Sequence, residues 1–172
     1  SARDSEGSTR DLQLKLNRDT DSEVGRVLAG ISYRPPTHLL APQLYALGIS
    51  YFKAREDEKA AVILTFLTGM EDTGQFRTPE NYLLTGISWY RIDHYKLANK
   101  YFNLVLDTEG TEETVKYHAQ ARLWKALTAK MSGRYKLSQQ QLKELVSYHP
   151  HSKEAVWVNK KQKRMPSGFM EH

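Results

Sequence analysis

The chain has 172 residues, a length that suits one domain able to bury a core of its own. Apolar residues make up 40% of it and charged residues 26%, as in an ordinary soluble globular protein, and no apolar run reaches the length of about 18 that a membrane span needs. It has no cysteine, which excludes disulfides, thiolate catalysis and cysteine-based zinc sites, and its formal net charge of +5 is spread among 20 acidic and 25 basic residues, with only the C-terminal segment locally basic.

Residues 1–40 are predicted to form an N-terminal arm. The first ten are small and polar and lack the basic and apolar regions of a signal peptide, but the chain does not begin with Met, so a signal or anchor removed upstream stays open. In residues 11–16, leucines alternate with polar residues at the period of a half-buried strand. We interpret this segment either as an extended arm or short helix on the surface, or as a strand that pairs with another chain.

One short helix is predicted inside the arm. Thr20 followed by Glu23 has the pattern of a capping box, and apolar residues at helical spacing continue to Ile31. Pro35 and Pro36 then stop the helix, because proline lacks the N–H that an intrahelical hydrogen bond requires.

Signals for helical hairpins follow the arm. Pro42 lies in the first turn of a predicted helix, where its missing N–H costs nothing, and Gly69 stops the next helix. Thr78 before Pro79 marks the start of a second hairpin, and Thr111 with two glutamates marks the third, since acidic residues favour the positive end of a helix. The predicted repeat domain covers residues 41–162, with hairpins at about 41–74, 79–112 and 113–150, a cap helix at 152–162 and a tail at 163–172.

The three hairpins share one register of small and large residues. Aligned on Gly48, Gly86 and Ala126, they repeat at intervals of 38 and 40 residues. Small residues at such positions let two helix backbones approach closely, so a larger residue there should overpack the hairpin. The residues at the equivalent positions three, twelve and sixteen residues later are Tyr51, Trp89 and Ala129, then Ala60, Ala98 and Ser138, then Leu64, Phe102 and Leu142.

The stretch YLLTGISWYRIDHYKLANKYFNLVL, residues 82–106, resembles a tetratricopeptide repeat. Its matching positions are Gly86, Trp89, Tyr95, Ala98 and Phe102. The resemblance covers residues 41–162 and implies an all-α fold, a right-handed α-α superhelix of about three hairpins with a C-terminal capping helix.

The chain departs from the repeat pattern at two positions. Asp57 stands where the later hairpins have a turn tyrosine, and Lys125 occupies a position that is normally apolar. We therefore expect the first helix of the third hairpin to be rotated by part of a turn, so that it uses Leu123, Trp124 and Leu127.

The resemblance also implies a concave groove, lined by the first helix of each hairpin, that binds a peptide or helix of a protein partner. Family members that bind a C-terminal carboxylate have Asn and Lys in this groove, whereas Ala46, Leu84 and Trp124 stand here. It stays open whether residues 11–40 fill the groove or bind another chain, and whether the chain forms homo-oligomers. The predicted groove residues are Tyr45, Ile49, Phe52, Lys53, Leu83, Ile87, Tyr90, Arg91, Leu123, Leu127 and Lys130.

No motif for catalysis, metal binding or nucleotide binding is found. Six histidines are scattered without the HExxH spacing, and the glycine-containing segments lack the Gly-Lys-Ser/Thr of a phosphate-binding loop. The aromatic residues occupy packing positions of the repeat rather than a base-stacking platform. We therefore expect no enzyme activity, no cofactor and no nucleic-acid partner.

These observations predict a non-enzymatic adaptor or scaffold for protein–protein interaction. The segment ELVSYHPHSKEA, residues 144–155, is similar to repeat boundaries in bacterial outer-membrane lipoprotein assembly factors and Tol-associated periplasmic proteins. This similarity favours a role in assembling a bacterial envelope or secretion complex at the periplasmic or outer-membrane face, with membrane association through a partner or a removed anchor. The alternative is a cytoplasmic chaperone for secreted substrates, which matches the length, although such chaperones tend to be acidic.

Overall fold

The computed structural model describes residues 23–69 and 71–160, and over these residues the chain is all-helical, without a strand. The predicted strand at residues 11–16, the cap at Thr20 and the tail at 163–172 lie outside the described residues. The elements are α3 (Glu23–Ala29), α4 (Ala41–Lys53), α5 (Asp57–Gly69), the 3-10 helix η1 (Glu71–Phe76), α6 (Pro79–Arg91), α7 (Tyr95–Asp107), α8 (Val115–Met131), α9 (Tyr135–Tyr148) and α10 (Lys153–Asn159).

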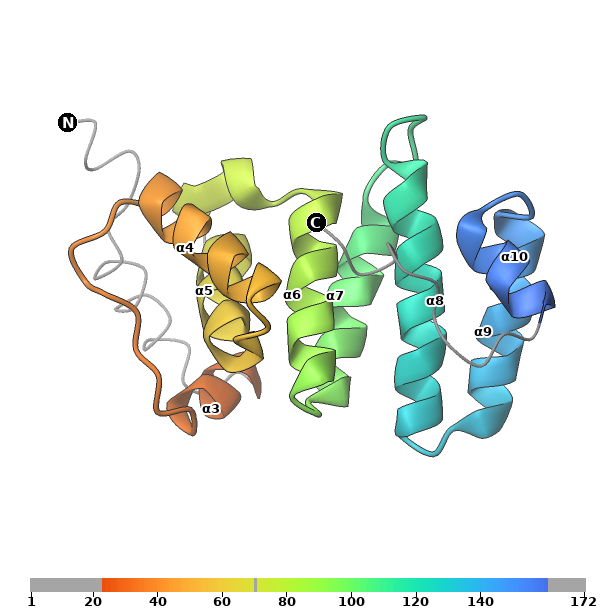
Figure 1. The fold of residues 1–172 in the computed structure, drawn as a ribbon, viewed down its shortest axis with the longest axis horizontal. Helices are drawn as coiled ribbons and strands as arrows, with labels where there is room; N and C mark the ends of the chain where they lie inside the picture. The colour runs from red at the N-terminus through yellow and green to blue at the C-terminus, as the bar shows by residue number, and fades with distance from the viewer. Residues whose placement is uncertain (1–22, 70, 161–172) are drawn as a thin grey trace.

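Consecutive helices pack as hairpins, α4 with α5, α6 with α7 and α8 with α9. The hairpins stand side by side in chain order, and α10 packs on α9 at the C-terminal end (Figure 1). The second helix of each hairpin also packs against the first helix of the next, and α6 contacts α8. The described chain is therefore a helical repeat-like array, with α4, α6 and α8 as the first helices and α5, α7 and α9 as the second helices.

The three hairpin turns are built alike. Each has three residues between its helices, and the middle residue has a positive φ, 61° at Arg55, 67° at Asp93 and 81° at Gly133. In each turn the N–H of the last residue donates to the carbonyl five residues earlier, a closure that ends a helix sharply. These bonds join Glu56 to Tyr51, His94 to Trp89 and Arg134 to Ala129, at N···O distances of 2.9, 3.0 and 2.9 Å.

The aligned small residue of each hairpin lies where its two helices touch. A Cβ added at Gly48 would lie 2.7 Å from Cγ2 of Ile63, and one at Gly86 would lie 2.6 Å from Cε1 of Phe102. Carbon atoms do not approach so closely without displacing a neighbour, so the predicted close contact of the helices depends on these glycines. The third hairpin has Ala126 in the equivalent position.

The helix starts follow the predicted signals with one exception. Thr78 caps α6 as predicted, because its hydroxyl accepts the N–H of Asn81 at 3.2 Å. The helix predicted to start at Thr111 instead begins at Val115. The hydroxyls of Thr111 and Thr114 each accept the N–H of the other residue, at 3.2 and 2.8 Å, and this pair closes a turn before the helix.

The buried core lies mainly in the first two hairpins. Its main cluster includes the fully buried Trp89 and reaches α8 at Trp124. A second, much smaller cluster consists of Ala119, Leu123 and Leu145 and joins α8 to α9. The C-terminal hairpin therefore has less buried apolar surface than the others.

Residues 23–40 cover the N-terminal end of the array (Figure 1). The ring of Tyr33 meets that of Tyr51 edge-on, with 6.0 Å between centroids. Glu23 of α3 pairs with Lys96 at the start of α7 at 3.5 Å. The described part of the predicted arm thus packs against helices of its own chain.

Candidate functional site

The predicted groove residues lie on α4, α6 and α8, but they differ in exposure. Phe52, Leu83, Ile87 and Leu123 are at most 2% exposed and belong to the core. The prediction that these four residues line a groove was therefore wrong. Helical periodicity places them on the same face as the exposed residues, but the neighbouring hairpins cover their side chains. Of the other predicted groove residues, Tyr45, Ile49, Tyr90 and Leu127 are half-buried, and Lys53 and Lys130 are exposed. Arg91 is half-buried as a whole residue, but its side chain is nearly buried.

Arg91 connects the first two hairpins instead of standing at a rim. Its Nη1 lies 3.3 Å from Oδ1 of Asp57, and its guanidinium carbon lies 4.7 Å from the centroid of the Phe52 ring. Only 5% of the Arg91 side chain is exposed. Burial and then the charge of Arg55 lower the pKa of Arg91, while Asp57 acts in the opposite direction. Arg91 is thus a structural tie between α6 and the start of α5.

Two groove tyrosines also make contacts between hairpins. The hydroxyl of Tyr45 donates to Oδ1 of Asn81 at 3.0 Å, and its ring centroid lies 5.0 Å from that of Phe76. The ring of Tyr90 lies 5.1 Å from that of Trp124. Burial is the main cause that raises the pKa of both tyrosines, so both hydroxyls stay neutral near pH 7.

Among the predicted groove residues, one apolar or aromatic side chain on each first helix stays partly accessible, and α4 and α8 each also have an exposed lysine. Ile49 on α4 and Leu127 on α8 are half-buried, and Lys53 and Lys130 are exposed at the C-terminal ends of the same helices. We call Ile49, Tyr90 and Leu127 together the strip, because each can bury an apolar side chain of another segment while the lysines attract acidic ones.

A polar cluster lies where the start of α8 meets the ends of α7 and α9. His118 Nε2 lies 3.1 Å from the Thr108 hydroxyl, which itself donates to the carbonyl of Val105 at 2.6 Å, so the neutral imidazole donates from Nε2. Burial, followed by the charge of Arg122, lowers the pKa of His118, and the same two causes lower the pKa of His149. The folded chain therefore favours neutral imidazoles here.

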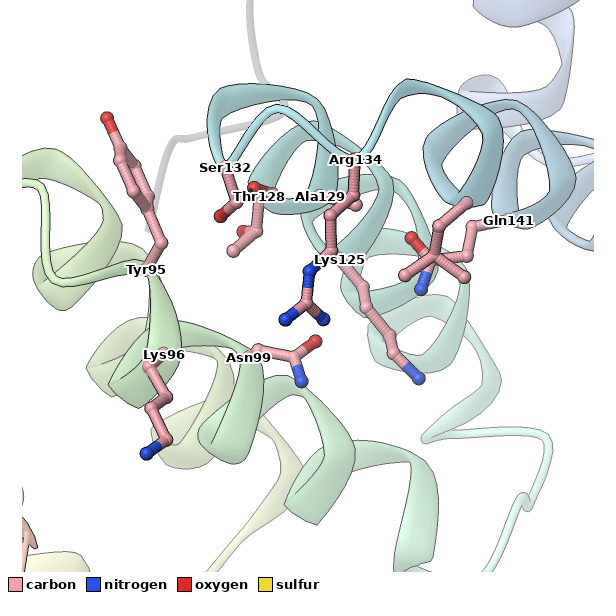
Figure 2. A pocket seen from close by; sticks show the side chains of 10 residues that line it. Tyr95, Lys96, Asn99, Lys125, Thr128, Ala129, Ser132, Arg134 and Gln141 are labelled. Atoms are coloured by element: carbon pink, nitrogen blue, oxygen red, sulfur yellow. Dashed lines mark hydrogen bonds between the residues drawn. The ribbon is translucent and has the colours of Figure 1, made fainter.

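A hollow between α7 and α9, the α7–α9 pocket, was not among the predicted sites. It has a volume of about 370 Å³ and is floored by α8 (Figure 2). Its lining includes Asn99 of α7, Lys125 and Ala129 of α8, Arg134 of the following turn and Gln141 of α9. The signal in the sequence was Lys125, a charged residue where the repeat normally has an apolar one.

In comparisons with known proteins, no family model matches the chain, and no curated protein matches it. None of the described helices is long and apolar enough to cross a membrane. Residues 23–69 and 71–160 hold no group of three or more His, Cys, Asp or Glu side chains that could bind a metal ion.

Proposed function

We propose that this chain is a non-enzymatic adaptor of the tetratricopeptide-repeat type, a right-handed superhelix that binds a peptide or helix of a partner protein. The observation that carries the proposal is the strip of Ile49, Tyr90 and Leu127, one part-exposed apolar or aromatic side chain on each first helix. One such side chain on each of three successive hairpins suits an extended or helical segment. Lys53 and Lys130 favour a segment that also carries acidic residues.

The proposed setting is the assembly of a bacterial envelope or secretion complex. Support comes from the similarity of the sequence of residues 144–155 to repeat boundaries in envelope assembly proteins. In the structure these residues form the boundary between α9 and α10, where the hydroxyl of Ser152 accepts the N–H of Ala155 at 3.0 Å. Fractionation of cells that express the full gene tests this setting. Recovery in the periplasmic or membrane fraction supports it, and recovery only in the cytosol supports the chaperone for secreted substrates.

The binding test changes strip residues that the core does not need. Ile49→Glu and Leu127→Glu place a carboxylate on the strip, whereas Ile87→Glu would bury a charge at a position that is 0% exposed. Val156→Glu on α10 makes a matched change at a residue that is 42% exposed and outside the strip.

The partner is first identified by photo-crosslinking from position 127, and its affinity is then measured for each variant. We expect both strip variants to bind about tenfold more weakly, because a charge is buried in the interface, and Val156→Glu to bind as wild type does. Circular dichroism checks that all three variants are folded. Equal affinity of all three for the crosslinked partner would contradict the proposal.

A further inference from the structure

The α7–α9 pocket exists because the third hairpin lacks two large side chains that the second hairpin has. In the shared register, Trp89 and Tyr101 correspond to Ala129 and Gln141. Trp89 is fully buried and its Nε1 donates to the Thr65 hydroxyl at 2.9 Å, and Tyr101 is 3% exposed. Ala129 and Gln141 cannot fill the same volume, so a hollow of about 370 Å³ is left between α7 and α9.

Two further differences at equivalent positions of the hairpins bring two cations to the hollow. Lys125 and Arg134 stand where the second hairpin has Thr85 and His94. The Arg134 side chain extends from the α8–α9 turn into the pocket (Figure 2). Within residues 23–69 and 71–160 neither cation forms an ion pair, whereas Lys96, at the edge of the pocket, pairs with a glutamate of α3. No acidic side chain of the described residues lines the pocket.

Neutral groups of the pocket can also bind a polar ligand. Gln141 is only 8% exposed, and its side-chain oxygen has no hydrogen-bond partner among the described residues. This oxygen only accepts hydrogen bonds, so a hydroxyl group of a ligand or a water can supply its missing partner, whereas an anion is bound by N–H donors of the pocket. Asn99 lies on the opposite wall, and α9 begins at Tyr135 beside the pocket, so the positive end of its dipole adds to the two cations.

We propose that the α7–α9 pocket binds a small oxyanion, the carboxylate or phosphate group of a metabolite-sized molecule, between Arg134 and Lys125. A guanidinium can donate two parallel hydrogen bonds to either group, and a lysine adds a second positive charge. The volume of about 370 Å³ falls within the range of about 300–1,000 Å³ that is usual for small-molecule sites. This site lies on the second-helix layer, so it is independent of the proposed peptide strip.

The test is a titration of ¹⁵N-labelled protein with inorganic phosphate and, separately, with citrate, at constant pH and ionic strength. We expect saturable shifts of the Gln141 and Asn99 side-chain amide signals, and the probe with the lower Kd identifies the preferred group. Arg134→Gln should raise both Kd values about tenfold, since it removes a charged donor. Lys143→Gln removes one charge from an exposed position of α9 outside the pocket and should leave both Kd values unchanged.

A second variant fills the α7–α9 pocket and keeps its two cationic side chains. Ala129→Trp with Gln141→Tyr installs the side chains of the second hairpin, so saturable binding should disappear although Lys125 and Arg134 are retained. Circular dichroism monitors its folding, and if this variant does not fold, the pair Arg134→Gln and Lys143→Gln decides. The proposal is overturned if neither probe gives saturable shifts, if those two variants bind alike, or if the folded double variant still binds.

Discussion

The middle residue of each hairpin turn has a backbone conformation that suits glycine, yet only the third turn contains one. Arg55 and Asp93 have φ angles of 61° and 67°, where a Cβ is crowded, and Gly133 has a φ of 81°. In all three hairpins the middle turn residue donates to the carbonyl three residues earlier, and the last turn residue to the carbonyl five residues earlier. The first two turns therefore hold a strained residue, and the rest of each hairpin compensates for its cost.

At this turn position, replacing glycine should lower stability, and introducing glycine should raise it. We expect Gly133→Ala to lower the free energy of unfolding by about 1 kcal/mol and Arg55→Gly to raise it, because only glycine adopts this φ without strain. Gly69→Ala is the control, since that glycine also has open space around it but an ordinary helical φ. Urea denaturation measures all three, and a loss of stability in Gly69→Ala equal to that in Gly133→Ala would argue against the backbone explanation.

Two histidines, the buried His118 and the half-buried His149, should make stability depend on pH. The folded chain lowers the pKa of His118 and His149 from the ordinary 6.5, first by burial and then through Arg122. The unfolded chain then binds protons more readily, so stability is present above pH 6.5 and is lost as the pH falls through 6.5 toward the lowered values.

We expect His149→Gln to reduce this acid-induced loss, as measured by urea denaturation at a series of pH values. Burial raises the pKa of Glu154 from 4.5, so this residue makes the folded chain more stable as the pH falls, opposite to the histidines. Because Glu154 is present in both the variant and the wild type, its contribution cancels when their pH profiles are compared. His38→Gln, at an exposed position, is the control. An unchanged pH profile in His149→Gln would contradict the assignment.

At the scale of the helix, the close contact within a hairpin depends on a matched pair of residues. The second hairpin combines Gly86 with Phe102, and the ring occupies the space that a Cβ would need. At the equivalent positions the third hairpin combines Ala126 with Leu142. Between these two hairpins, the larger residue on one helix is matched by the smaller residue on the other, whereas in the first hairpin Ile63 is the side chain nearest to Gly48.

This pairing predicts a measurable coupling. Gly86→Ala should destabilise the protein by about 1–3 kcal/mol through overpacking against the ring, and Phe102→Leu should cost about 1 kcal/mol or more through a cavity. The double variant reproduces the pair of the third hairpin, so its cost should be less than the sum of the two. A double-mutant cycle in urea measures the difference, and strict additivity would show that the two sites do not share the contact.

At the scale of the whole molecule, the core is unevenly distributed along the array. Its main cluster joins α3 to α8, whereas the cluster of Ala119, Leu123 and Leu145 holds the last hairpin with few apolar side chains. In repeat-like arrays each unit is stabilised mainly by its neighbours. The C-terminal end should therefore open without unfolding the rest.

Native-state hydrogen exchange should show that the C-terminal helices open more easily than the rest of the array. We expect backbone amides of α9 and α10 to exchange faster than those of α5 and α6, because local opening there exposes less buried apolar surface. Leu145→Ala, at a residue that is 0% exposed, should speed exchange in α9 and leave α5 unchanged. Uniform protection along all of these helices would mean that the array unfolds as one unit.

Much of the helical architecture is predictable from local sequence signals. The cap at Thr78, the stop at Gly69 and the small residues at Gly48 and Gly86 act within one helix or one hairpin, and the structure places each where it was predicted. The predicted start of α8 was wrong by one turn, because residues 111–114 form a turn that the two threonine hydroxyls close with reciprocal hydrogen bonds, and the helix begins only after it.

The accessible surface depends on contacts between hairpins, which helical periodicity does not describe. Periodicity shows that Leu83 and Ile87 share a face with Tyr90, but not that neighbouring helices cover the first two and leave Tyr90 half-buried. In the same way, Ala129 and Gln141 become the walls of a pocket only because no neighbouring side chain fills the space that Trp89 and Tyr101 occupy one hairpin earlier. The elements follow from local chemistry, while the candidate sites arise from how closely successive hairpins pack.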